Sequence, residues 1–285
     1  MAWGAPLPAP AKINQFLHVI GRRADGYHLL QTVFRFLDRA DQLRFFPRDD
    51  GEVILRTPLP GVPAQSDLTV RAAHALQRAT GCRRGVEIEL EKNLPLGGGL
   101  GGGSSDAATV LIALNRLWGL DLPRERLQAI GLELGADVPV FVFGRAAFGE
   151  GVGERLSALS LAPAWYLVVV APAPVATASV FAEPALTRDS PAVTIAAFSA
   201  DGRVPAQLLG FGRNDLEAVV RRKQPEVDQV LQELCRYPGA RMSGSGSSCF
   251  AWFADEASAR SALATLPPRW PAWVARGIDF HPLFG

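Results

Sequence analysis

Apolar and polar positions repeat with two different periods along the first hundred residues. Runs rich in valine, isoleucine and aromatic residues predict strands, and apolar residues spaced by three or four positions predict a helix that Asp67 would cap. The expected strands cover residues 11–20, 43–46, 53–56 and 86–90, and the expected helix covers residues 68–79. Two pairs of strands and one helix therefore come before residue 95.

The rest of the chain again mixes strand-like and helix-like patterns. Helices are predicted at 104–118, 124–134, 226–235 and 256–266, and strands at 167–171, 240–242, 249–253 and 274–280. Residues 138–143 form a further apolar run, and residues 184–205, rich in Ala, Pro and Ser, predict a connection of low order. This order predicts an α+β sandwich with a boundary near 154–163, which gives domains 1–157 and 158–285 and leaves the last strand free to return to the first domain.

The composition indicates a globular protein with a full core. The chain has 285 residues, of which 48% are hydrophobic, and 29 basic side chains against 28 acidic ones. This balance gives no reason to expect a nucleic acid or an acidic membrane as a partner. The apolar stretches are too short to cross a bilayer, and the first residues lack the basic and apolar regions of a secretory signal.

The three cysteines, Cys82, Cys235 and Cys249, are odd in number and lack the spacing of metal ligands. We interpret them as structural thiols of a reducing compartment and expect a cytoplasmic protein with no metal site of its own.

A run of glycines is the strongest local signal for function. Six of the seven residues from Gly97 to Gly103 are glycine, and Ser104, Ser105 and Asp106 follow as capping or first-turn residues of the next helix. Glycines let the backbone approach a ligand closely, and a helix that begins there offers free N–H groups and the positive end of its dipole. An anion such as a phosphate chain binds well at such a place. The run therefore predicts a nucleotide site.

Three other interpretations of the run are weaker. A Walker A loop needs a lysine at its end, and none occurs between Lys92 and Lys223. A dinucleotide fingerprint is present at Gly97, Gly99 and Gly102, but the expected acidic residue after the next strand is missing. A flexible linker would not need a strand before it and an amphipathic helix after it.

Two charged residues stand out in apolar surroundings. Lysine occurs only three times in the chain, yet Lys12 lies in an apolar strand-like stretch, where its point charge is able to sit beside a phosphate or an acid. Asp137 lies between the end of a predicted helix and the apolar run 138–143. An exposed edge-strand lysine and a simple helix cap remain the alternatives.

Taken together, these stretches resemble the 4-diphosphocytidyl-2-C-methyl-D-erythritol kinases, a family of the galactokinase, homoserine kinase, mevalonate kinase and phosphomevalonate kinase (GHMP) superfamily. The resemblance lies in residues 10–14 and 21–28, the glycine run 95–105, residues 135–139 and residues 242–246. The glycine run alone indicates only the superfamily. The segment 22–28 is more specific, because it resembles the substrate segment of this family.

The resemblance implies a small-molecule kinase. The implied reaction is ATP-dependent phosphorylation of the tertiary 2-hydroxyl of the cytidine-diphosphate-linked methylerythritol, in the non-mevalonate route to isoprenoid precursors. The implied fold has an N-terminal ATP-binding domain like ribosomal protein S5 domain 2 and a C-terminal ferredoxin-like α/β sandwich, with the active site between them. A monomer or a weak homodimer is expected.

The resemblance also implies roles for individual residues. Asp137 is expected to be the general base, and Lys12 to hold it ionised and to stabilise charge at the attacking hydroxyl. The residues expected to bind ATP are Lys92, Pro95, Leu96, Gly97, Gly98, Gly99, Leu100, Gly101, Gly102, Gly103, Ser104 and Ser105. Those expected to bind the substrate are Asn14, Tyr27, His28, Thr177, Phe181 and Gly244, with His28 on the cytosine edge and Tyr27 and Phe181 stacked on its ring.

Magnesium is expected to travel with ATP, because no carboxylate pair suited to holding it is evident. Asp67 stands where this family commonly has an asparagine near the adenine, so the adenine contacts are not carried over. Two further classes remain open: another kinase of the superfamily, without a cytosine pocket, and a nucleotide-binding module that does not need Lys12 and Asp137 together.

Overall fold

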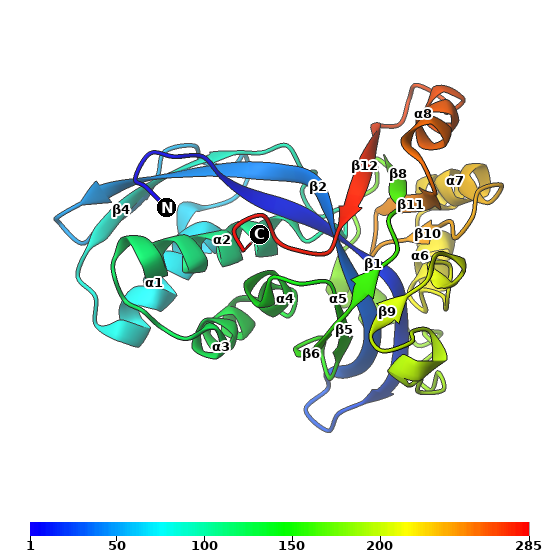
Figure 1. The fold of residues 1–285 in the computed structure, drawn as a ribbon, viewed down its shortest axis with the longest axis horizontal. Helices are drawn as coiled ribbons and strands as arrows, with labels where there is room; N and C mark the ends of the chain where they lie inside the picture. Colours follow the sequence, from blue (N-terminus) through cyan, green and yellow to red (C-terminus); the bar gives the residue numbers. More distant parts are fainter. Residues whose placement is uncertain (285) are drawn as a thin grey trace.

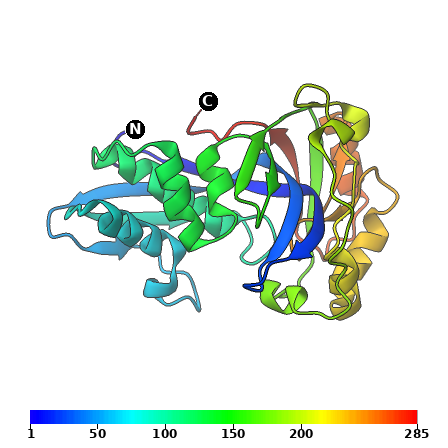
Figure 2. The same ribbon diagram turned by 90° about the horizontal axis from the view of Figure 1, so that it is seen from below.

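Most strands of the chain join into one long sheet that carries helices at both ends (Figure 1). The computed structural model describes residues 1–284. The main path of the sheet follows the order β10-β11-β8-β12-β2-β4-β3, and β1, β5 and β6 extend it at β2. Helices α1 to α4 gather beside β2 and β4, whereas α6 to α8 lie beside β8 and β11 (Figures 1 and 2).

Two long paired strands form the centre of the first half. Strand β1 (Leu7–Arg22) pairs antiparallel with β2 (His28–Arg48), and three register shifts interrupt the pairing. Both strands are longer than the strands predicted at residues 11–20 and 43–46. They are buried along most of their length and so lack a clean apolar–polar alternation. The shifts bend the ribbon and re-aim its side chains.

The second edge of β2 is shared by three strands from different parts of the sequence. Thr32–Phe34 pair with β5 (Ala147–Glu150), Phe36 and Leu37 with β12 (Ala272–Ile278), and Gln42–Arg48 with β4 (Gly85–Glu91). Two short strands complete this part, β3 (Val53–Leu55) beside β4 and β6 (Arg155–Ala158) beside β5. Strands β5 and β6 were not predicted.

Four helices cover one face of this first half. Helix α1 (Leu68–Thr80) is capped by Asp67, whose side chain accepts a hydrogen bond from the Thr69 N–H, as predicted. Helix α2 (Gly102–Leu117) begins two residues before its predicted start, so Ser104, Ser105 and Asp106 are first-turn residues. Helix α3 (Arg124–Leu134) has its predicted bounds, and the apolar run after Asp137 is the short helix α4 (Val138–Phe143). A 3-10 turn, η1 (Ala64–Ser66), precedes α1.

The second half is built around β8. Strand β8 (Trp165–Val170) lies between β11 (Ser248–Phe253) and β12, and β10 (Arg241–Met242) pairs with β11. The predicted helices correspond to α7 (Pro225–Leu234) and α8 (Glu256–Ala264), while α5 (Thr177–Phe181) and α6 (Glu217–Lys223) were not predicted. The remaining elements are β7 (Ser160–Leu161), η2 (Ile195–Ala197), β9 (Arg203–Val204) and η3 (Ala206–Leu208).

The segment 184–205 is largely irregular, as predicted, and contains only one 3-10 turn and one two-residue strand.

Strand β12 joins the two halves. It pairs with β8 through residues 272–276 and with β2 through Gly277 and Ile278, so the sheet continues without a break from one half to the other. An apolar cluster lies at this junction and includes Ile13, Phe16, Leu37, Tyr166 and Phe250. The division of the chain at residue 157 stays a prediction.

Candidate active site

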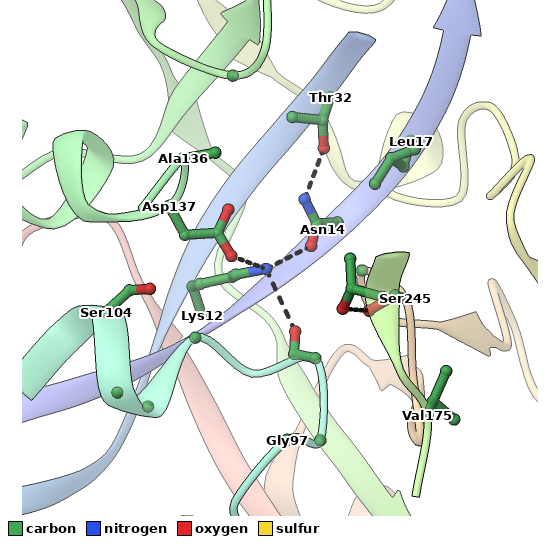
Figure 3. Close-up of a pocket in the computed structure, with 18 of the residues that line it drawn as sticks. Lys12, Asn14, Leu17, Thr32, Gly97, Ser104, Ala136, Asp137, Val175 and Ser245 are labelled. Carbon is green, nitrogen blue, oxygen red and sulfur yellow. Dashed lines mark hydrogen bonds and ion pairs between the residues drawn. The ribbon is translucent and has the colours of Figure 1, made fainter. Parts of the chain in front are cut away.

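A cavity of about 440 Å³ opens where the glycine loop meets β1, α4 and the second half. Its wall combines parts of the chain that are far apart in sequence (Figure 3). The residues that line it include Lys12, Asn14, Thr32, Phe34, Pro95, Leu96, Gly97, Gly98, Gly99, Gly101, Gly102, Gly103, Ser104, Asp137, Thr177, Phe181, Gly244 and Ser245. Most residues predicted to bind ATP or substrate thus share one wall.

Lys12 lies at the floor of this cavity, with only 2% of its side chain exposed. Its Nζ donates to the Asn14 Oδ1 at 2.7 Å and to the Gly99 carbonyl at 3.2 Å, and it lies 3.1 Å from the Asp137 Oδ2. An ammonium group has three hydrogens, so these three partners account for all of them. The exposed edge-strand alternative for Lys12 is therefore wrong.

Asp137 occupies the N-cap position of α4, but its side chain makes no capping hydrogen bond. The carboxylate instead faces Lys12 and is 36% exposed towards the cavity (Figure 3). The alternative of a simple helix cap is therefore wrong for its side chain. Asp137 has the two features that a proton acceptor needs: its carboxylate is accessible from the cavity, and a fixed cation lies beside it.

Asn14 and Thr32 hold Lys12 in place from the side of the sheet. The Thr32 hydroxyl donates to the Phe16 carbonyl at 2.5 Å, so its oxygen accepts from the Asn14 Nδ2 at 2.9 Å. Because the amide nitrogen of Asn14 is used in this way, its oxygen faces Lys12. Thr32 was not among the predicted residues, because a threonine in a strand carries no local sign of such a contact.

The glycine loop comes so close to its surroundings that side chains would not fit at two positions. A Cβ at Gly99 would lie 2.2 Å from the Ser243 carbonyl oxygen, and one at Gly101 would lie 2.9 Å from the Phe141 ring and 3.0 Å from the Lys12 Cε. Both residues also have positive φ angles, of 75° and 70°. The loop therefore needs glycine here to pack against the second half and against Lys12.

The two serines after the loop differ in their surroundings. Ser104 faces the cavity from the first turn of α2 (Figure 3). Ser105 is completely buried and does not line the cavity. The Ser104 side chain is therefore placed to meet a ligand in the cavity and that of Ser105 is not, while both contacts with ATP stay predictions.

The loop 243–246 of the second half closes against the glycine loop. The Ser243 hydroxyl donates to the Gly99 carbonyl at 2.9 Å, and Gly244 and Ser245 line the cavity. Asn214 fixes this loop from below, because its Nδ2 donates to the Met242 and Gly244 carbonyls, both at 2.8 Å. Ser243 and Asn214 were also missed, since each acts on residues distant in sequence.

A second cavity of about 660 Å³ adjoins the first. It contains Tyr27 and His28, and it shares Thr177 and Phe181 with the first cavity. His28 lies on Phe181 with ring centroids 4.9 Å apart, while Tyr27 is 64% exposed. Phe181 therefore lines both cavities.

Lys92, which precedes the glycine loop in sequence, lies in a buried charge cluster. Its Nζ pairs with the Asp106 Oδ2 at 2.7 Å and with Asp41. Burial acts to lower the pKa of Lys92, but the two carboxylates outweigh it and raise that pKa, while burial raises the pKa of Asp106. Lys92, Asp67 and Leu68 line a small cavity of about 160 Å³ next to the loop.

The described residues include no cluster of three or more His, Cys, Asp or Glu side chains suited to a metal ion. Within the same residues, no helix has both the length and the apolar character to span a membrane.

Comparison with known proteins places the chain among kinases. Residues 67–145 match the family model of the GHMP kinases N terminal domain, and residues 195–272 match that of the GHMP kinases C terminal. Together these regions contain the glycine loop, Asp137 and the loop 243–246.

Two relatives match over nearly the whole chain. The 4-diphosphocytidyl-2-C-methyl-D-erythritol kinase of Thiobacillus denitrificans is 58% identical over 277 residues, which cover 97% of this chain and 96% of the relative. The enzyme of the same name from Dechloromonas aromatica is 55% identical and covers 97% of this chain and 98% of its own length.

Two of the solved structures that resemble this chain are also kinases. A crystal structure of 4-(cytidine 5'-diphospho)-2C-methyl-D-erythritol kinase superposes with a TM-score of 0.81 at 36% identity, covering 96% of this chain and 99% of that one. Homoserine kinase from Cytophaga hutchinsonii shares the fold, with a TM-score of 0.71 at 17% identity and coverage of 99% and 96%. The expected GHMP kinase fold is thereby confirmed.

Proposed function

The chain belongs to the 4-diphosphocytidyl-2-C-methyl-D-erythritol kinase family of the GHMP kinases, and from this premise we propose how its residues carry out the reaction of that family. The enzyme transfers the terminal phosphoryl group of ATP to the 2-hydroxyl of 4-diphosphocytidyl-2-C-methyl-D-erythritol, which gives the 2-phosphate and ADP. This step belongs to the non-mevalonate pathway of isoprenoid precursor biosynthesis.

We assign the role of general base to Asp137. The observation that supports this is the ion pair of 3.1 Å between its Oδ2 and the Lys12 Nζ on the cavity floor. The substrate oxygen forms a bond to the γ-phosphorus while the bond to the bridging oxygen breaks, and that electron pair stays on ADP. The hydroxyl proton passes to the Asp137 carboxylate. A tertiary alcohol is a poor acid, so its proton moves late, after most of the transfer of the phosphoryl group.

Lys12 acts by its charge and by its fixed position. Its three hydrogens are bound to Asn14, Gly99 and Asp137, so the ammonium group is held between the base and the glycine loop. From there its positive charge stabilises the negative charge that develops on the attacking oxygen. Binding to the loop carbonyl also couples the base to the place where the phosphates would lie.

We place the ATP phosphates at the glycine loop, residues 95–105, with Lys92 at its far end. The backbone N–H groups and the start of α2 favour an anion there. The Ser104 hydroxyl suits a Mg²⁺ ion carried with ATP, because such an ion prefers oxygen ligands and keeps several waters. When bound, the ion would neutralise charge on the transferred group.

The substrate would extend from the first cavity into the second. Asn14, Thr177 and Gly244 would contact its polar groups near the transferred phosphoryl group, while Tyr27, His28 and Phe181 would bind the cytosine. The two cavities share the lining residues Leu30, Ala136, Val152, Thr177 and Phe181, so one elongated molecule is able to occupy both.

A coupled assay of ADP release tests this proposal. Purified protein with ATP and magnesium is given the cytidyl-linked methylerythritol, and in parallel free methylerythritol phosphate, homoserine or mevalonate. We expect turnover with the cytidyl compound alone, because only that compound fills the second cavity. Turnover with another alcohol would overturn the assignment of Tyr27, His28 and Phe181 to the base.

A further inference from the structure

Arg188 organises the segment that follows α5, and all five of its N–H donors are in use. Four of them bind backbone carbonyls at 2.8 to 3.4 Å, and the fifth, on Nε, donates to the His28 Nε2 at 3.0 Å. The four carbonyls belong to Phe181, Glu183, Pro184 and Leu186. This arginine therefore links the backbone behind Phe181 to the ring that lies on Phe181.

The contact with Arg188 determines which nitrogen of His28 carries the proton. A guanidinium group is always protonated and only donates, so the His28 Nε2 has to accept. A neutral imidazole has one N–H, which must then be on Nδ1. Among the described residues, the hydrogen bond of the His28 ring is the one at Nε2, and His28 lines the second cavity with its Nδ1 left for a ligand. The Nδ1–H is thus a free donor in the second cavity.

The surroundings keep His28 neutral. Burial lowers the pKa of His28, and the positive charges of Arg188 and Arg22 lower it further. An imidazolium would also direct a second N–H at the guanidinium, which the 3.0 Å contact does not allow. The ring is held in place by Phe181 at a centroid distance of 4.9 Å.

We propose that Arg188 is a positioning residue that determines base specificity, because it holds His28 as the Nδ1–H tautomer and so selects a base with a hydrogen-bond acceptor in its ring. This inference rests on the proposed function, in which His28 faces the cytosine. The N3 atom of cytosine is an acceptor, whereas N3 of uracil carries a hydrogen. A donor fixed on His28 therefore pairs with cytosine and leaves two donors facing each other with uracil.

The tautomer is measured directly by ¹⁵N NMR of the imidazole nitrogens in the unmodified protein at pH 7.5. The chain has four histidines, and the His28 signals are identified by their loss in His28→Gln. We expect a protonated Nδ1 and an unprotonated Nε2. A proton on Nε2 would overturn the proposal. This measurement does not depend on turnover, so it stands apart from any failure of the proposed function.

The specificity is measured with the cytidyl substrate and its uridine counterpart. In Arg188→Met, His28 is free to change its tautomer. The ratio of kcat/KM for the cytidyl compound to that for the uridyl compound should therefore fall about tenfold. This factor corresponds to the free energy between a hydrogen bond made with cytosine and a donor left unpaired with uracil. The KM for ATP should stay unchanged. An equal loss on both substrates, with the ratio kept, would show that Arg188 only holds the segment, and would overturn the proposal.

Two further variants complete the test. Lysine also only donates, so Arg188→Lys should retain much of the preference for cytidine, and a ratio as low as in Arg188→Met would contradict the role of a fixed donor. Arg260→Met removes an exposed arginine that pairs with Glu256 in α8, and it should leave the ratio unchanged. If Arg188→Met does not fold, the lysine variant and the NMR measurement still decide.

Discussion

At the scale of single residues, the ammonium group of Lys12 has no hydrogen left for a further partner. Its three contacts join β1, the glycine loop and the start of α4 at one point. A change at any of them alters the place of the positive charge relative to the base. The position of the charge is thus as important to the proposed mechanism as its presence.

Asp137→Asn keeps the shape of the side chain and removes its ability to accept a proton. We expect turnover to fall by about a hundredfold or more, the usual contribution of a placed acid–base group, while ATP binding persists. Steady-state assays and nucleotide titration measure the two effects. Asp201→Asn is the matched control, because Asp201 is exposed and its positive φ suits asparagine. Full turnover in Asp137→Asn would exclude Asp137 as the base.

The sequence predicted the residues that carry out the chemistry of this site better than the residues that hold them in place. Lys12, Asp137 and the glycine run stand out by residue type or by spacing, and the resemblance to a family gave them roles. Thr32, Arg188 and Asn214 give no such signal, because the contacts by which they support the site reach Asn14, His28 and Met242, which lie 18, 160 and 28 positions away in sequence. Only the fold brings those partners together.

At the scale of elements, the glycine loop and the loop 243–246 close against each other. Gly99 lies at this contact, whereas a Cβ at Gly97 would meet nothing within 4 Å. Both glycines have positive φ angles, of 75° and 68°, so alanine at either position should cost about 1–2 kcal/mol of unfolding free energy.

Gly99→Ala should do more than strain the backbone. Its Cβ would collide with the Ser243 carbonyl and push the two loops apart, so kcat/KM should fall by about a hundredfold, as a displacement of about 1 Å at an active site does. Gly97→Ala is the control for the strain alone and should lose much less. Equal losses in the two variants would mean that contact between the loops does not matter for catalysis. Kinetics and chemical denaturation of both variants measure the two effects.

The elements that were predicted best are those with one buried face. Helices α1, α3 and α7 show the helical period clearly, and their predicted bounds agree with the structure within a residue. Residues 28–42 of β2 were missed, because residues 31–37 are buried on both faces of the sheet and the stretch contains charged residues such as Arg35 and Asp41. Their partners come from distant segments, so no local pattern indicates a strand there.

At the scale of the whole molecule, the C-terminal segment fastens the second half to the first. His281 is fully buried between Phe36 and Phe284, and its backbone N–H donates to the Gly144 carbonyl at 3.0 Å. Burial lowers the pKa of His281 to about 3. The folded state therefore requires this histidine to be neutral, whereas the unfolded chain takes up a proton near pH 6.5.

This difference predicts how stability depends on pH. Above pH 6.5 the histidine is neutral in both states and has no effect, and below it the free energy of unfolding falls, by about 2 kcal/mol between pH 7 and pH 5. In His281→Asn, whose Oδ1 is able to accept from the Leu283 N–H as Nδ1 does, that part of the loss should disappear. Urea denaturation of both proteins at the two pH values measures it. Parallel losses would contradict a neutral, buried His281.

The pairing of β12 with β2 also has a consequence for how the protein is made. The ribosome completes β12 after every other strand of the sheet, so Phe36 and Leu37 of β2 have no partner on that edge while the chain is still growing. An unpaired strand edge is a place where nascent chains associate with one another. During synthesis the sheet therefore has a gap between β5 and β4, and this gap closes only when β12 has been made and is free to fold.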